Sequence, residues 1–482
     1  MRITEIEIKN FKAFHGTYQI DLHKAGKNLL VYGENGSGKS SLYFALMRFL
    51  ESGDDPLHRF ENDQNIFIAD AGYIKLCLRA DEGSRKTIYE WSESVRETDD
   101  ELIIEASKAK GFLDYKSLLD THYLHQKRNT VNVFELLRKT LLANTVSTLT
   151  NRTLDHDWAA IQPPYPRRNA TGKIADLEKQ TEAFNTELTN RLAELQPIAS
   201  EILGKFGHNV ALNFDFPGIQ YNRDTKTLDN QEILLTVALF DRDIPDHHHF
   251  LNEARLSAIA IAIYFSSILI QPESRLKILA LDDVLIGLDT SNRLPVLDIL
   301  NEYFPDHQIF LTTYDKTWYE IAKQRTPDAK WKYAEFYTSK TDEYEIPVYA
   351  EDKAYLEKAK DYFADNDYKA SAIYLRTAFE TVIKKFCEKK GLRVRYCENP
   401  KKLKGDDFWI PIKTGKRNDN TPFLEPSLIN DIELYRSIIL NPLSHSSTVT
   451  VVKKEISDAI KAVEKLKTKL ARNLRNDPRA HS

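Results

Sequence analysis

Eight consecutive residues have the types and spacing needed to hold a phosphate group. Gly33-Glu34-Asn35-Gly36-Ser37-Gly38-Lys39-Ser40 fits the pattern G-x-x-x-x-G-K-[ST] at every fixed position. Glycines in such a loop let backbone N–H groups turn toward a β-phosphate, and the helix that follows adds its positive N-terminus. A glycine turn that merely precedes a helix is the alternative, but it does not account for the Lys-Ser pair in register. The sequence therefore predicts a strand, a nucleotide-binding loop and a helix.

The side chains of this loop have separate expected roles. Lys39 is expected to reach the β and γ oxygens of ATP, and Ser40 to bind Mg²⁺. The other residues here that we expect to contact ATP are Gly33, Asn35, Gly36, Ser37, Gly38 and Ser41.

Two adjacent carboxylates follow a second apolar run, "RLKILALDD", which is typical of a Walker B strand. We expect Asp282 to hold Mg²⁺, directly or through water, and Asp283 to polarise the attacking water. The run "IFLTTYD" predicts the neighbouring parallel strand, which ends in a polar switch that includes Tyr314.

A further metal-site residue is expected from the polar segment before residue 131. Gln126, or one of its neighbours His122 and His125, is the candidate for sensing the γ-phosphate and Mg²⁺ from a loop. Three consecutive histidines at 247–249 do not predict a second metal site, because adjacent side chains in a loop converge poorly on one ion.

Composition narrows the class of protein. A chain of 482 residues predicts two or more domains, and a net charge of −4 gives no global sign of nucleic-acid binding. The clearest local basic segment is 453–479, with nine Lys and Arg against four Asp and Glu, although a solvated helix face explains it equally well.

Three cysteines without CxxC spacing, and an N-terminus without a signal-peptide core, favour a reducing, cytoplasmic location. The longest apolar run, 256–270, is too short to span a membrane and predicts a buried helix.

The hydrophobic pattern predicts two domains. An α/β domain covers residues 1–345, with strands near 73–79 and 86–92. Within it, residues of about 170–206 keep a 3-4 spacing of apolar side chains, which predicts a short coiled-coil insertion or, equally, an amphipathic helix lying on the domain. A charged linker then leads to an all-helical domain at 351–475.

The order of these motifs resembles that of ABC-type ATPase heads, in particular the RecF and SMC-like branch, over about residues 1–337. That branch typically begins with a strand and an N-F-basic-x-F pattern, here Asn10-Phe11-Lys12-Ala13-Phe14, which adds Lys12 to the expected nucleotide contacts. The resemblance implies that Leu251-Asn252-Glu253-Ala254-Arg255 takes the place of the signature L-S-G-G-Q and that Asp289 belongs to the D-loop. Asn252, Arg255 and Asp289 would then act on ATP held by a second copy, in a head-to-tail sandwich.

Departures from the pattern of that branch imply slow turnover. Glu253 and Ala254 replace signature glycines, Asp283 stands where a glutamate is usual, and Tyr314 stands where a switch histidine is usual. These changes suit a nucleotide-gated switch better than a transporter or motor.

Two runs, "FLNEARLSAIAIAIY" and "LTTYD", resemble a subgroup of ATPases from anti-phage defence systems such as Septu and PARIS, in which an ATPase works with a separate nuclease. "LRTAFETVIKKFC" followed by "NPLSH" resembles the HEPN-like domains attached to such ATPases. HEPN ribonucleases typically carry R-x(4 to 6)-H. Here Asn441 and His445 are present, the expected arginine position is Leu440, and Arg436 is the nearest substitute.

The sequence thus predicts an ABC-type, P-loop ATPase head with a HEPN-like helical domain. Its expected cofactors are ATP and Mg²⁺, and its expected role is to oligomerise and regulate an effector nuclease, encoded nearby, in phage defence. One alternative is a RecF-like DNA repair clamp, for which nucleic acid is the partner. Another is a HEPN ribonuclease toxin gated by ATP.

Overall fold

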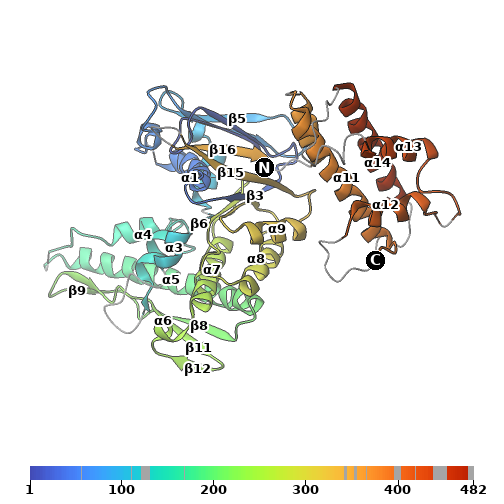
Figure 1. The fold of residues 1–482 in the computed structure, drawn as a ribbon. Helices are drawn as coiled ribbons and strands as arrows, with labels where there is room; N and C mark the ends of the chain where they lie inside the picture. The colour runs from blue at the N-terminus through green and yellow to red at the C-terminus, as the bar shows by residue number, and fades with distance from the viewer. Residues whose placement is uncertain are drawn as a thin grey trace. The chain divides into compact units, whose positions relative to one another are not determined.

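The computed structural model divides the chain into two compact units, Met1–Glu351 and Asp352–Ser482 (Figure 1). It describes residues 1–55, 57–109, 111–120, 131–167, 169–340, 345–351, 355–364, 366–395, 403–417, 419–437 and 453–475. Each unit has a hydrophobic core of its own.

The first unit begins with an antiparallel sheet in the order β2-β1-β4-β5. Its strands are β1 (Arg2–Lys9), β2 (Thr17–Asp21), β4 (Tyr73–Arg79) and β5 (Thr87–Ser92). Ile6 and Ile8 alternate with charged residues along β1, and this period of two buries them in one core with helix α1 (Lys39–Asp54). The two strands predicted near 73–79 and 86–92 are confirmed.

A second sheet positions the expected nucleotide site. Its order is β16-β15-β3-β14-β13-β6, and every neighbouring pair is parallel except β15 with β16. The strands are β3 (Asn28–Gly33), β6 (Phe112–Asp114), β13 (Ile278–Asp282), β14 (Gln308–Thr313), β15 (Trp331–Lys340) and β16 (Glu345–Glu351). Parallel strands end at a common edge, so residues that follow β3, β13 and β14 meet there.

The remaining elements of the first unit surround these sheets. The helices are α2 (Glu101–Lys108), α3 (Tyr115–Asp120), α4 (Leu154–Ala160), α5 (Thr171–Lys205), α6 (His247–Phe250), α7 (Glu253–Leu269), α8 (Thr290–Tyr303) and α9 (Lys316–Arg325), with short 3-10 helices at Phe60–Asp63 and Glu97–Asp99 and a π-helix at Leu136–Leu141. The small strands are β7 (Val131–Asn132), β8 (Val210–Asp215), β9 (Gln220–Asn222), β10 (Thr227–Asp229), β11 (Leu234–Leu239) and β12 (Arg242–Ile244).

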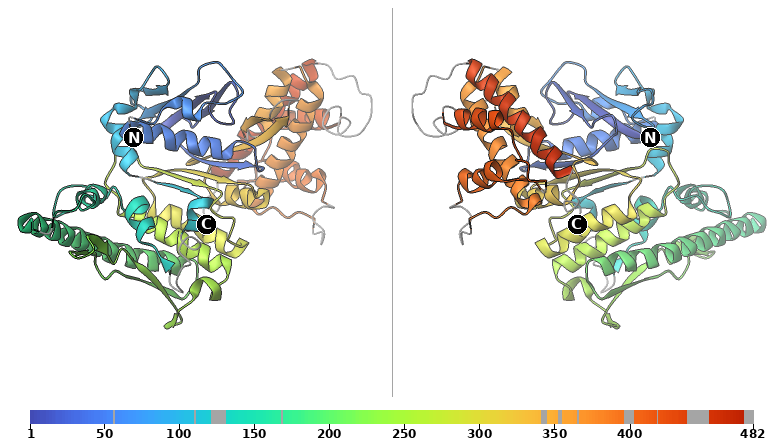
Figure 2. Two further views of the ribbon diagram at one scale, coloured as in Figure 1. Left: turned by 90° about the vertical axis from the view of Figure 1, so that its left-hand side faces the viewer. Right: turned by 90° about the vertical axis from the view of Figure 1, so that its right-hand side faces the viewer.

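Helix α5 differs from the predicted coiled-coil insertion. It is one continuous helix of 35 residues, about 50 Å long at 1.5 Å per residue (Figure 2). Its apolar stripe, which includes Leu177, Phe184 and Leu195, is buried in the core of the unit beside α7 and β8. A coiled-coil insertion needs a partner helix that extends with α5 away from the domain, whereas here α7 and β8 of the core cover the stripe, as the amphipathic-helix alternative requires.

The longest apolar run of the sequence forms helix α7, and residues 258–268 of it are buried, as predicted. Among the helices that the structure describes, none has both the length and the apolar character to cross a membrane.

The end of the first unit also differs from the prediction. Residues 345–351 were expected in a linker, but they form β16, the edge strand of the second sheet. Pro347 is buried in it, and a proline is tolerated there because an edge strand needs no N–H on its open side. Tyr18 donates a hydrogen bond to the Pro347 carbonyl at 2.6 Å, which holds β16 to β2. The first unit therefore extends to residue 351.

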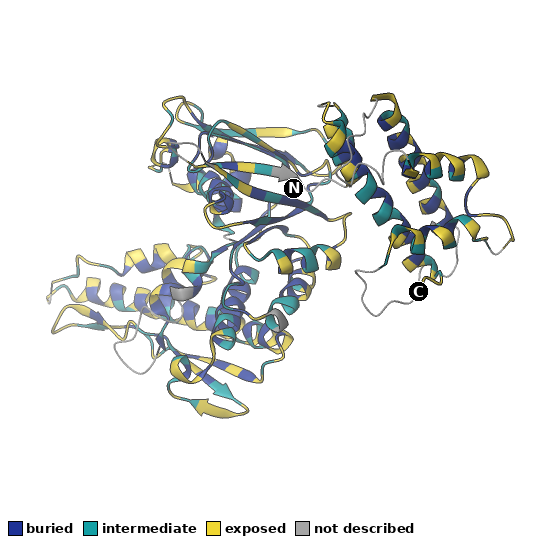
Figure 3. Cartoon of the chain, viewed as in Figure 1, coloured by how far each residue is buried: buried dark blue, intermediate teal, exposed yellow. Residues whose placement is uncertain are grey.

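The second unit is helical in the part that the structure describes. Its helices are α10 (Tyr355–Ala364), α11 (Tyr368–Lys390), α12 (Gly405–Thr414), α13 (Pro426–Tyr435) and α14 (Lys453–Arg475). Figure 3 shows that the helices turn their buried sides toward one another, around a core that includes Phe379, Trp409 and Ile432. The predicted 3.6-period stripes account for this packing.

Candidate functional site

The phosphate loop, residues 33–40, joins the end of β3 to the start of α1. Gly36 and Gly38 have φ angles of 85° and 96°, left-handed values that favour glycine. Gly38 is the N-cap of α1, and no side chain caps this helix, so its first N–H groups are left for a ligand. Ser40, in the first turn, is exposed, as a metal ligand at the mouth of the site must be.

Lys39 is held in place by oxygens of the loop. Its ammonium donates to the carbonyls of Gly33 at 2.8 Å and Glu34 at 3.1 Å, and it lies 3.3 Å from Asp283 Oδ2. The side chain is only 4% exposed, so these oxygens replace water around its charge. The structure therefore brings the lysine of the phosphate loop and the second carboxylate of the predicted Walker B strand together.

The two carboxylates occupy different environments at the end of β13. Thr312 Oγ1, at the end of the neighbouring strand β14, donates to Asp282 Oδ1 at 2.6 Å and accepts from the Asp283 N–H at 3.2 Å. Asp283 has a φ of 53°, a left-handed conformation that Asp tolerates better than most residues. Thr312 therefore holds the carboxylate of Asp282, at the end of the strand, and the backbone of Asp283, just beyond it.

The pKa of Asp283 is raised above its ordinary value. Burial is the main cause, and the neighbouring charge of Asp282 raises the pKa further, whereas Lys39 and the backbone N–H of Tyr314 lower it. A raised pKa makes a carboxylate a better proton acceptor, which suits a residue that would polarise water.

The site fits a nucleotide with Mg²⁺. Ser37 Oγ and Asp283 Oδ1 are buried and have no hydrogen-bond partner among the described residues. Buried polar atoms are normally satisfied, so these two oxygens are suited to a ligand. Ser40 and Asp282 offer the oxygen ligands that Mg²⁺ prefers, with phosphate oxygens and water completing its shell.

Lys12 and Ser41 lie beside the loop and are already engaged. Lys12 pairs with Asp63 at 2.7 Å, and its ammonium lies 4.9 Å from the ring centroid of Phe44. Burial opposes ionisation of Asp63, but hydrogen bonds from Lys12 and His58 outweigh it and lower the pKa of Asp63. Ser41 Oγ accepts the backbone N–H of Ala13 at 3.3 Å. These contacts tie the N-terminal segment to α1, and a role of either residue in ATP binding stays a prediction.

The signature-like segment and the D-loop lie against each other. Asn252 is the N-cap of α7, and its side chain accepts the N–H of Arg255 at 3.0 Å. A Cβ added at Gly287 would lie 2.1 Å from Ser257 Oγ in the second turn of α7, so the D-loop passes this helix closely.

Asp289, in the D-loop, lies near the signature-like segment. It is the N-cap of α8, where it accepts the N–H of Asn292 at 2.9 Å. Burial and the charge of Arg255 lower the pKa of His208, while Asp289 raises it, which places both charges near one imidazole. The structure therefore gathers Asn252, Arg255 and Asp289 on one part of the unit.

Tyr314 follows β14 directly, and its side chain is 39% exposed. The next residue, Asp315, caps α9 and forms an ion pair with Arg293. The predicted switch tyrosine therefore stands at the edge of the sheet that carries the loop and both carboxylates.

The predicted sensor Gln126, with His122 and His125, lies outside the described residues. Thr312 was not predicted as a site residue, because its role depends on hydrogen bonds to the neighbouring strand. Asp114, which pairs in register with Asp282 at the end of β6, was not predicted either. The short run Gly111-Phe112-Leu113-Asp114, apolar and ending in a carboxylate, was the available signal.

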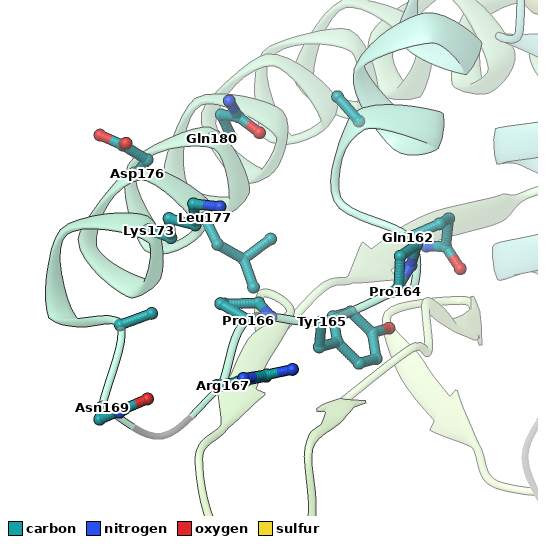
Figure 4. A pocket seen from close by; sticks show the side chains of 12 residues that line it. Gln162, Pro164, Tyr165, Pro166, Arg167, Asn169, Lys173, Asp176, Leu177 and Gln180 are labelled. Atoms are coloured by element: carbon teal, nitrogen blue, oxygen red, sulfur yellow. The ribbon is translucent and has the colours of Figure 1, made fainter.

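A pocket of about 640 Å³ lies elsewhere in the first unit. Figure 4 shows it between the loop that carries Tyr165 and Arg167 and the first turns of α5, with Lys173 and Gln180 on the helix. No residue of the phosphate loop or of the carboxylate pair lines it. This pocket is therefore separate from the candidate nucleotide site.

In the second unit, Arg436 is a structural residue. It is 9% exposed, pairs with Asp406 at 2.5 Å and with Glu433 at 3.5 Å, and its guanidinium lies 5.5 Å from the ring centroid of Phe379. A guanidinium buried in this way is not available to a scissile phosphate. Asn441 and His445, the other residues of the predicted HEPN-like motif, lie outside the described residues.

Comparison with known proteins identifies one family. A family model described as "RecF/RecN/SMC N terminal domain" matches residues 2–327. No curated protein matches the chain.

Three similar solved structures are all heads of SMC proteins. The SmcHead bound to the C-winged helix domain of ScpA is 13% identical, with a TM-score of 0.41, and the match covers 74% of this chain and 100% of that one. The Smc head domain with an extended coiled coil bound to the C-terminal domain of ScpA, from Pyrococcus furiosus, is 13% identical with a TM-score of 0.42, covering 76% and 99%. The SMC head domain from Thermotoga maritima is 14% identical with a TM-score of 0.36, covering 73% and 100%.

Replacing Lys39 by alanine should weaken ATP binding about 10- to 100-fold, because a charge-assisted contact to phosphate is lost. The measurement is a calorimetric titration with Mg-ATP, with thermal unfolding as a check on folding. Lys24→Ala, at an exposed lysine of the same unit, is the matched control and should bind normally. ATP affinity that is unchanged in Lys39→Ala would overturn the assignment of the phosphate loop.

The two carboxylates should respond differently to substitution by asparagine, which keeps their shape and tolerates the φ of Asp283. Asp283→Asn removes a negative charge beside the phosphates and should bind ATP at least as well as the parent but hydrolyse it much more slowly. Asp282→Asn should lose the Mg²⁺-dependent part of ATP affinity. Titrations with and without Mg²⁺, and single-turnover hydrolysis, separate these effects. Identical behaviour of the two variants would show that their roles are assigned wrongly.

Proposed function

Because the chain belongs to the RecF/RecN/SMC N-terminal domain family, we propose that it is an ATP-gated switch that associates head to tail and controls an effector nuclease in anti-phage defence. The ATPase activity follows from the family, since residues 2–327 form an ATPase head of the SMC and RecF-like, ABC-type branch. The observation that supports ATP-dependent switching is the contact of Lys39 with Asp283, which joins the phosphate loop to the carboxylate that would act on water. The defence role rests on the sequence resemblance of "FLNEARLSAIAIAIY" and "LTTYD" to defence ATPases.

In the proposed mechanism, the residues of one head bind and hold the nucleotide. Lys39 exchanges its loop carbonyls and Asp283 for phosphate oxygens, and the N–H groups at the start of α1 complete the cradle. Ser40 and Asp282 would hold Mg²⁺, whose charge would neutralise part of the phosphate charge. Asp283, released from Lys39, accepts a hydrogen bond from the attacking water.

A second head supplies the remaining contacts. Asn252, Arg255 and Asp289 lie together on one part of the unit, and among the described residues none of the three forms a hydrogen bond or ion pair with the phosphate loop. They are placed to meet ATP on a partner in a head-to-tail sandwich. Glu253 and Ala254 in place of signature glycines, Asp283 in place of glutamate and Tyr314 in place of histidine support slow hydrolysis, as a switch requires.

We assign the second unit, which is HEPN-like by its sequence, to docking rather than to RNA cleavage. Leu440 stands at the expected arginine position, and the nearest substitute, Arg436, is buried in ion pairs. A developing phosphorane needs donors, and losing one typically costs about 2.7–4 kcal/mol of transition-state stabilisation. The docked partner would be a nuclease encoded nearby, by resemblance to defence ATPases that work with separate nucleases.

Arg255→Glu should abolish ATP-dependent association and leave ATP binding by the single chain intact. The measurement is sedimentation velocity with Mg-ATP, in the Asp283→Asn background so that ATP persists. Arg242→Glu, at an exposed arginine of β12, is the matched control and should still associate. Hydrolysis by the unmodified chain that is independent of protein concentration would rule out the sandwich.

The defence role predicts a phage phenotype. Cells that carry the gene with its neighbouring reading frames should reduce plaque formation, and Lys39→Ala should remove that protection because the switch can no longer close on ATP. Efficiency of plating on a phage panel is the measurement. Sensitivity to DNA damage in the Lys39→Ala strain, without any change in plating, would instead support the repair clamp.

A further inference from the structure

The charges of the chain are divided unequally between its units. Residues 1–351 carry 40 Lys and Arg against 53 Asp and Glu, a formal charge of −13. Residues 352–482 carry 27 Lys and Arg against 18 Asp and Glu, a formal charge of +9. The near-neutral total of −4 therefore conceals a basic unit that lies outside the family match.

Part of this positive charge is concentrated at the end of α11. The α11 basic surface consists of six cations: Lys384, Lys385, Lys389, Lys390, Arg393 and Arg395. Glu388 is the one acid within residues 384–395. All of the six except the half-buried Lys390 are exposed.

Most of these cations lack an acidic partner. Among the described residues, Lys385, Lys389, Arg393 and Arg395 form no ion pair, and Lys384 reaches Glu380 only at 3.8 Å. Other cations of the same unit are paired with an acid at 2.5–2.9 Å, namely Lys360, Lys413, Lys469 and Arg436. Lys385 and Lys389 are four residues apart on one helix face, where like charges repel. Folding therefore leaves Lys385, Lys389, Arg393 and Arg395 without an acidic partner among the described residues, and the repulsion between neighbouring cations has a cost in stability.

The helix dipole accounts for only part of the cluster. Cations are favourable in the last turn of a helix, which covers Lys389 and Lys390. Lys384 and Lys385 lie further back, and Arg393 and Arg395 follow the C-cap Gly391, whose φ is 62°. Capping of α11 does not require these four cations.

We propose that the α11 basic surface binds the phosphate backbone of a nucleic acid. Double-stranded DNA carries one negative charge per about 1.7 Å of its axis, and exposed cations that lack acidic partners can bind it with release of counterions. The acidic first unit of another copy is a poorer match, because its 53 acids are mixed with 40 cations. Contacts through Lys and Arg to phosphate carry no sequence information, so binding is expected to be sequence-independent.

The test uses the full chain without ATP and three fluorescent 20-mers: single-stranded RNA, single-stranded DNA and duplex DNA. Anisotropy titrations over a salt series compare the unmodified chain with the triple variant Lys385→Glu, Lys389→Glu, Arg393→Glu. The matched control is Lys454→Glu, Lys461→Glu, Lys465→Glu, which makes the same charge change at exposed residues of α14. Circular dichroism establishes that both variants are folded.

The proposal expects the first variant to bind at least about tenfold more weakly at 100 mM salt, with the salt slope reduced by about 2 to 3 in magnitude, and the control to lose much less. The 20-mer that binds best identifies the class of nucleic acid. Equal losses in both variants would mean diffuse attraction by net charge and would overturn the assigned surface. Unchanged nucleic-acid binding, with self-association lost only in the first variant, would overturn the proposal in favour of docking on an acidic head. ATP binding is measured separately, so failure here is distinguishable from failure of the proposed switch.

Discussion

The first unit depends on the burial of one ammonium group. Lys39 is 4% exposed, and a buried charge is tolerated only when oxygens replace the water that it has lost. The carbonyls of Gly33 and Glu34 supply two of these oxygens, and Asp283 supplies the third. Since β14 separates β3 from β13, Thr312 at its end must position the carboxylates across the gap. The order of strands in the sheet therefore determines which carboxylate can reach the lysine of the phosphate loop.

Local patterns predicted the parts of the site that are local. The phosphate loop is contiguous, so spacing alone placed Lys39 and Ser40, and apolar runs that end in Asp282 and Thr313 indicated two buried parallel strands. The N-cap at Asn252 is local in the same way, because the capping side chain accepts from an N–H three residues further on.

The misses share a physical cause, which is that each depends on a partner far away in the sequence. The apolar stripe of α5 fits a coiled coil or a domain surface equally well, and only the presence of α7 beside it decides. Residues 345–351 contain a proline and follow a charged run, so they look like part of a linker, yet pairing with β15 makes them a strand. Arg436 was a candidate for contacting a scissile phosphate, but it forms an ion pair with Asp406, which is thirty residues away in the sequence.

The family match ends at residue 327, but the sheet does not. β15 pairs with β3 along Trp331 to Phe336, and Pro347 of β16 lies against the phosphate loop, where a Cβ on Gly38 would come within 2.8 Å of it. A chain cut at the end of the family match would leave β3 as an open edge strand, prone to pairing with other chains. The segment that gene fusion or recombination must keep intact is therefore longer than the segment that the family model matches. A new C-terminal partner can be exchanged cleanly only beyond residue 351.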